Sequence, residues 1–67
     1  MSLSLFTKEK RKLLNLTQQD LADKAGVGIR FIRDLEQGKL TLRMDKVNQV
    51  LHLFGQELGP VSLNKNI

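Results

Sequence analysis

The sequence predicts an all-α domain of four short helices, followed by a short extended segment. Apolar residues recur at helical spacing in four stretches, and an asparagine or a glycine follows each stretch. The single proline, Pro60, comes after the last stretch. Because proline fits poorly in a helix or a central strand, residues 56–67 are expected to form an edge strand or arm. We therefore expect a helical domain over 1–55 and an arm over 56–67.

The first helix is expected over about residues 5–14. This stretch is rich in straight-chain helix formers and contains no glycine or proline. Its apolar face is thin and consists of Phe6, Leu13 and Leu14. Asn15 tolerates the left-handed conformation and is expected to end the helix.

The second helix has clear end signals. Thr17 is followed three residues later by Asp20, which is a capping-box-like start. Gly26 stands where a left-handed residue closes a helix. A short apolar stripe lies between these ends: Leu21, Ala22 and Ala25.

The third helix is expected over residues 28–37, closed by Gly38, with two different faces. A wheel at about 100° per residue places Phe31, Ile32 and Leu35 on a packing face. The opposite face carries Ile29, Arg30, Arg33 and Gln37, with Asp34 at its edge. Only residues 26–28 separate the second and third helices. A short glycine-containing turn between two short helices fits a helix-turn-helix.

The fourth helix is expected over residues 44–54, before Gly55. Its apolar residues form a core stripe: Met44, Val47, Val50, Leu51 and Phe54. Apolar residues continue in the arm at Leu58, Val61 and Leu63.

Composition restricts the function. The chain has 67 residues, no cysteine and one histidine, so we expect no metal site, no cofactor and no enzymatic activity. No apolar stretch is long enough to span a membrane and no signal peptide is evident, so a cytoplasmic, nucleoid-associated location is expected. The formal net charge of +4 suits a polyanionic partner. A domain this small also gains from association with a second chain.

A resemblance to a known family rests on residues 16–27, on Ile32 and on residues 35–39. These segments resemble the Cro/C1-type (XRE family) helix-turn-helix of phage repressors, with the Thr-Gln-x-x-Leu-Ala start, the Gly-Val turn and the Glu-x-Gly-Lys exit at family spacing. The resemblance covers Phe6 to Phe54. It implies a lambda-repressor-like fold, and a homodimer that binds double-stranded DNA at a palindromic operator.

The resemblance also implies site residues. The third helix would enter the major groove and read bases through Ile29, Arg30, Arg33 and Asp34. Each arginine would bind a guanine or a phosphate, and Asp34 would accept from a cytosine amine or orient an arginine. Contacts to the DNA backbone would come from Gln18, Gly28, Lys39, Thr41 and Arg43. Gly28 departs from the family, which commonly has a serine or threonine there, and it brings no hydroxyl.

Arg11 and Glu36 match a family pair that forms a partly buried ion pair between the first and third helices. A planar guanidinium suits a carboxylate, so we interpret both residues as structural and not as DNA ligands.

A narrower resemblance, to HipB-like antitoxin regulators of the y4mF type, rests on residues 31–39, residues 45–51 and the Leu58-Gly59-Pro60-Val61 tail. It implies a C-terminal strand that pairs across the dimer axis through Leu58, Val61 and Leu63. It also implies a HipA-like kinase toxin as a partner. Two alternatives remain open: a protein-interaction module that does not read DNA, and a stand-alone phage-type repressor.

Overall fold

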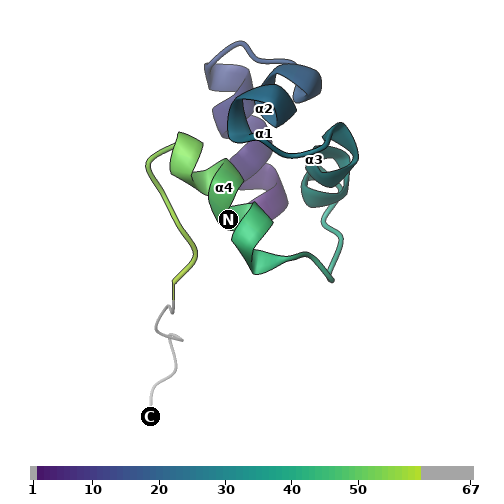
Figure 1. Cartoon of the computed structure of the whole chain (residues 1–67). Coiled ribbons are helices and arrows are strands. Elements are labelled where there is room, and N and C mark those ends of the chain that lie inside the picture. The colour runs from purple at the N-terminus through teal and green to yellow at the C-terminus, as the bar shows by residue number, and fades with distance from the viewer. Residues whose placement is uncertain (1, 60–67) are drawn as a thin grey trace.

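A computed structural model describes residues 2–59 of the chain and shows four helices (Figure 1). They are α1 (Leu3–Leu13), α2 (Gln18–Ala25), α3 (Ile29–Glu36) and α4 (Met44–Leu53). The predicted all-α fold is therefore confirmed. Residues 56–59 form no strand, and the rest of the expected strand, including Val61 and Leu63, lies outside the described residues.

The core lies where α3 packs against α1 and α2, and where α2 packs against α4. The buried apolar residues are Leu21, Ala22, Ile32, Leu35, Val47, Val50 and Leu51. Phe31 and Phe54 are half-buried against this cluster. The prediction that Met44 belongs to the core is wrong, because its side chain is 67% exposed. Leu42 makes the core contact at this end of α4 instead.

α1 begins two residues earlier than expected, because Ser2 caps it. The Ser2 hydroxyl accepts a hydrogen bond from the Leu5 amide at 3.2 Å. The helix ends before Asn15, which has the left-handed φ of 57° that its residue type tolerates. The thin apolar face of α1 packs through Phe6, whose ring meets that of Phe54 edge-on at a centroid distance of 6.3 Å.

α2 begins and ends as its sequence predicts. The Thr17 hydroxyl accepts from the Asp20 amide, and the Asp20 carboxylate accepts from the Thr17 amide, both at 3.0 Å. Gly26 closes the helix at φ 75°, where a side chain would be strained. The Gln49 amide of α4 donates to the carbonyls of Ala25 and Gly26 at 3.3 and 3.4 Å. The turn between α2 and α3 is thus held from α4.

The arm runs back along α4 after a reversal at Gly55 (Figure 1). The Gln56 amide donates to the Leu51 carbonyl at 2.9 Å. Further along, the Leu58 amide donates to Asn48 Oδ1 at 2.7 Å. Leu58 is half-buried against the core. The arm is therefore attached to α4 at two points, through Gln56 and through Leu58.

Candidate nucleic-acid interface

The outer face of α3 presents two arginines. Arg30 and Arg33 are exposed, and within residues 2–59 neither guanidinium forms a hydrogen bond or an ion pair. Asp34 lies beside them, with a side chain 29% exposed. Ile29 also belongs to this helix, but it is half-buried and packs partly against the core. The face is therefore mainly basic, with an apolar margin at Ile29.

The opposite face of α3 fixes the helix to the domain. Ile32 is fully buried and Leu35 is 1% exposed. The last residue of α3, Glu36, has a side chain only 1% exposed, although it is a carboxylate. A buried carboxylate needs a cation and hydrogen bonds in order to be tolerated.

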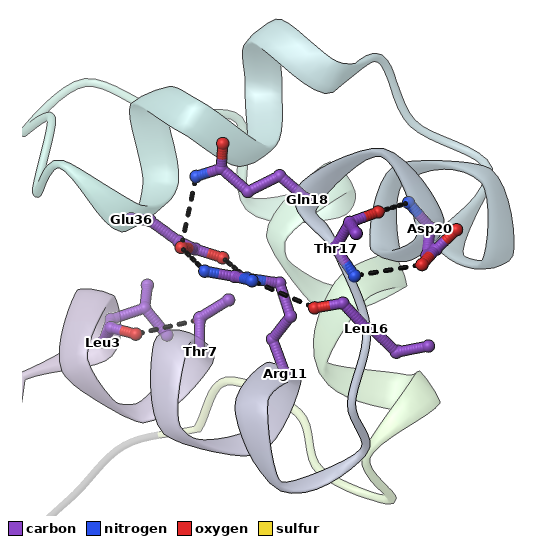
Figure 2. A network of polar contacts seen from close by, with 8 residues as sticks. All are labelled: Leu3, Thr7, Arg11, Leu16, Thr17, Gln18, Asp20 and Glu36. Carbon is purple, nitrogen blue, oxygen red and sulfur yellow. Dashed lines mark hydrogen bonds and ion pairs between the residues drawn. The ribbon is translucent and has the colours of Figure 1, made fainter.

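Figure 2 shows the partners of Glu36, which are Arg11 and Gln18. Arg11 Nε donates to Glu36 Oε2 at 2.7 Å, and Arg11 Nη2 donates to Oε1 at 3.0 Å. The remaining nitrogen, Nη1, donates to the Leu16 carbonyl at 3.0 Å. The hydrogen bond to Glu36 raises the pKa of Arg11 against the opposing effect of desolvation. This fork joins α1, the loop before α2 and the end of α3.

Gln18 also belongs to this network, which the sequence did not indicate. Its Nε2 donates to Glu36 Oε1 at 3.3 Å, and its side chain is half-buried. Gln18 is the first residue of α2, so this bond ties the start of α2 to the end of α3. No spacing rule relates positions 18 and 36, because tertiary packing alone brings them together.

The loop between α3 and α4 carries three predicted backbone-contact residues. Lys39 Nζ lies 3.5 Å from Asp34 Oδ2. Arg43 holds Asp45 through two hydrogen bonds, of 2.8 and 3.2 Å. The bonds from Arg43 also lower the pKa of Asp45. Thr41 is exposed. Exposed ion pairs are worth at most about 1 kcal/mol, so a phosphate can replace either carboxylate.

Gly28 is the N-cap of α3 and has an extended backbone, with φ −74° and ψ 153°. It makes no side-chain capping bond. The free amides of the first turn of α3 are therefore not satisfied by a hydroxyl of the preceding residue, as they are in α2. Amides in this position suit a phosphate oxygen.

Other kinds of site find no support in the part of the chain that the structure describes. Residues 2–59 contain no group of histidine or acidic side chains that would hold a metal ion. None of the four helices has the length and apolar character needed to cross a bilayer.

Comparison with known proteins identifies the family. A family model described as "Helix-turn-helix" matches residues 8–60, which is most of the chain. The chain belongs to the helix-turn-helix family, of the XRE type. The chain is also 58% identical over 45 residues to a protein of Sinorhizobium fredii named "Uncharacterized HTH-type transcriptional regulator y4mF". That alignment covers 67% of this chain and 59% of the relative, so it spans about three fifths of the relative's length.

In helix-turn-helix terms, α2 and α3 are the two helices of the motif, and residues 26–28 are its turn. The structure gathers Arg30, Arg33, Asp34 and Lys39 on α3 and its exit. Gln18 instead turns one amide hydrogen toward Glu36. The predicted dimer residue Leu58 lies on the arm, half-buried against the core of its own chain.

Proposed function

We propose that this chain is a sequence-specific DNA-binding transcriptional repressor that acts as a homodimer on a palindromic operator. The observation that carries the proposal is the pair of arginines on the outer face of α3, Arg30 and Arg33, which have no partner among residues 2–59 and stand on a helix fixed to the core through Ile32 and Leu35. An arginine can bind O6 and N7 of a guanine with two hydrogen bonds, which is the commonest specific contact in the major groove. In a dimer, two such helices would enter grooves about 34 Å apart.

Contacts to phosphates are assigned to the ends of the motif. Lys39, Thr41 and Arg43 follow α3, and the uncapped amides after Gly28 begin it. Such contacts position the domain on the duplex but carry no sequence information. Gln18 contributes as well: one hydrogen of its Nε2 is engaged by Glu36, and the second can donate to a phosphate oxygen. A regulator of this kind acts on the nucleoid, in the cytoplasm.

The decisive experiment compares two double variants by fluorescence anisotropy on DNA taken from upstream of the chain's own gene. Arg30→Ala with Arg33→Ala removes both reading groups. Each bidentate contact is worth about 1–3 kcal/mol, so specific affinity should fall about 100-fold or more. The matched control is Lys12→Ala with Lys24→Ala, which also removes two positive charges. These lysines line shallow surface pockets near the ends of α1 and α2.

The control should weaken binding only slightly, and equally on specific and unrelated DNA, because it changes the overall charge alone. If both double variants lose affinity equally, or if wild-type protein binds all sequences alike at low salt, the repressor proposal fails. A protein-interaction module that keeps the fold is then the better description.

A finer role as an antitoxin is supported by sequence resemblance alone. Residues 31–39, residues 45–51 and the tail from Leu58 resemble HipB-like antitoxins, which bind a HipA-like kinase toxin. The role predicts a HipA-like kinase gene beside this one, and relief of that kinase's growth arrest when the two are co-expressed. No relief in the presence of folded, DNA-binding regulator would leave a stand-alone repressor.

A further inference from the structure

The turn that ends α3 fixes Lys39 to Asp34. Gly38 has a left-handed φ of 80°, and its amide donates to the Leu35 carbonyl at 3.2 Å. The Lys39 amide donates to the Asp34 carbonyl at 3.0 Å. These bonds form a Schellman motif, in which the residue after the glycine often makes an apolar contact with the last turn of the helix. Here both positions are charged instead, and the backbone places the lysine beside the carboxylate.

The ion pair between these two side chains is loose. Lys39 Nζ lies 3.5 Å from Asp34 Oδ2, whereas a charge-assisted hydrogen bond measures about 2.7–2.9 Å. The two side chains are 53% and 29% exposed. By contrast, Arg11 holds the buried Glu36 with bonds of 2.7 and 3.0 Å. Because an exposed pair contributes little to stability, Lys39 can leave Asp34 by rotation of its flexible side chain while its backbone stays bound.

Asp34 needs another partner once Lys39 moves to a phosphate. A carboxylate only accepts hydrogen bonds, and it is repelled by the phosphates around it. In the major groove, cytosine offers an amino donor, whereas guanine and thymine offer acceptors. Adenine offers its amino group beside the acceptor N7, so it suits a carboxylate less well. Of the four bases, cytosine is therefore the best partner for the freed Asp34.

Arg30 is the other group to which Asp34 could turn. It precedes Asp34 by four residues, a spacing that brings two side chains together on one face of a helix. Within residues 2–59, however, Asp34 pairs with Lys39 and not with Arg30. An ion pair with the cation on the N-terminal side is the less favourable order at this spacing. A base amine is therefore the partner that the geometry favours.

We propose that Asp34 and Lys39 form an exchange pair, in which Lys39 moves to a DNA phosphate only where a cytosine amino group replaces it at Asp34. The inference rests on the proposed repressor function and adds a specificity rule to it: one phosphate contact becomes conditional on one base. Where guanine stands in that place, Lys39 stays with Asp34. The wrong base then costs a backbone contact as well as a base contact, although the backbone itself carries no sequence information.

The first experiment finds the base that Asp34 faces. Each base pair of one operator half-site is substituted in turn, and wild type is compared with Asp34→Asn by fluorescence anisotropy. An asparagine amide both donates and accepts, so at one position this variant should lose an about 10-fold preference for cytosine over guanine. Its affinity for unrelated DNA should rise, because a negative charge near the phosphates is removed.

The second experiment counts phosphate contacts through the salt dependence of binding. Each contact changes the slope of log K against log salt concentration by about 0.9. For wild type, the slope should be steeper by that amount on the duplex with cytosine than on the duplex with guanine at the position found. The two slopes should be equal in Lys39→Gln, which lacks the conditional contact. They should be equal and steep in Asp34→Asn, whose lysine is free on both duplexes.

The matched control is Lys12→Gln, which removes an exposed lysine of α1 and should keep the wild-type difference between the slopes. Equal wild-type slopes on the two duplexes would overturn the proposal, and so would an Asp34→Asn variant with unchanged base preferences. A preference lost at the base pair that Arg30→Ala also relaxes would make Asp34 a support for that arginine, and this too would overturn it. Failure of the repressor function is recognised separately, because wild type then prefers no sequence, which would overturn both proposals.

Discussion

The two helices of the motif, α2 and α3, are each eight residues long, but different kinds of interaction fix their ends. Both ends of α2 are set by residues next to the helix: a reciprocal capping box at Thr17 begins it, and a left-handed glycine ends it. α3 begins at Gly28 with no side-chain cap, and its far end is fixed by the contact of Glu36 with Arg11. Local chemistry specifies α2, whereas the rest of the domain specifies α3. Among residues 2–59, the two arginines of α3 that we propose to read bases, Arg30 and Arg33, thus keep their side chains out of the contacts that hold the helix.

We expect the largest effect from removing the ion pair that fixes the end of α3 to α1. Arg11→Leu leaves the Glu36 carboxylate, 1% exposed, without its cation. Loss of one partner of a buried pair costs about 3–5 kcal/mol, which is most of the stability of a small domain. Urea denaturation should show a protein that is largely unfolded or unfolds at very low urea. The double variant Arg11→Leu with Glu36→Leu should recover much of the loss, because no charge is then buried alone. A double variant as unstable as the single one would argue against this account.

We expect the next largest effect from removing the side-chain cap at the start of α2. Thr17→Ala removes the hydroxyl that accepts from the Asp20 amide, which should lower the free energy of unfolding by about 1 kcal/mol. Thermal melting of this variant is best compared with that of Thr41→Ala. Thr41 is exposed and its side chain makes no hydrogen bond within residues 2–59, so its loss should be silent. Equal melting temperatures for the two variants would show that the cap contributes nothing.

A smaller effect concerns pH. The hydrogen bond from the Thr17 amide lowers the pKa of Asp20 below its ordinary value of 3.8. A group with a lowered folded pKa stabilises the fold above its unfolded pKa, and this contribution disappears as the pH falls through the folded value. The melting-temperature gap between wild type and Asp20→Asn should therefore be constant near neutral pH and shrink below about pH 4. A gap that stays the same down to pH 2 would contradict the assigned role of the carboxylate.

We expect the smallest effect from adding a side-chain cap at the start of α3. Gly28 has a φ of −74°, and a Cβ there would meet no atom within 4 Å, so Gly28→Ser is unstrained. Its hydroxyl can accept from a first-turn amide, and we expect a gain of only a few tenths of a kcal/mol. The matched control, Gly26→Ser, places the same side chain at φ 75° and should cost about 1–2 kcal/mol. A destabilised Gly28→Ser would show that the uncapped start is required by the fold.

The features that the sequence predicted are those set by near neighbours along the chain. The capping box at Thr17 and the close of α2 at Gly26 involve residues three or four apart, and both are confirmed. The core role of Met44 was wrong, because periodicity cannot show where a helix extends past the core it packs on. The sequence did not predict the hydrogen bonds that the amide side chains of Gln18, Asn48 and Gln49 make within the domain. Each bonds a partner at least ten positions away, and no local pattern marks it.

The Gln49 amide has a consequence for the motif as a unit. It binds the last carbonyls of α2 from α4, while Arg11 holds the end of α3 from α1. A peptide of residues 17–37 contains the whole motif but neither of these supports, and its eight-residue helices are too short to persist alone in water. The helix-turn-helix motif therefore cannot be transferred to another protein as an isolated segment. A transplant into another scaffold must carry the donors on α1 and α4 with it.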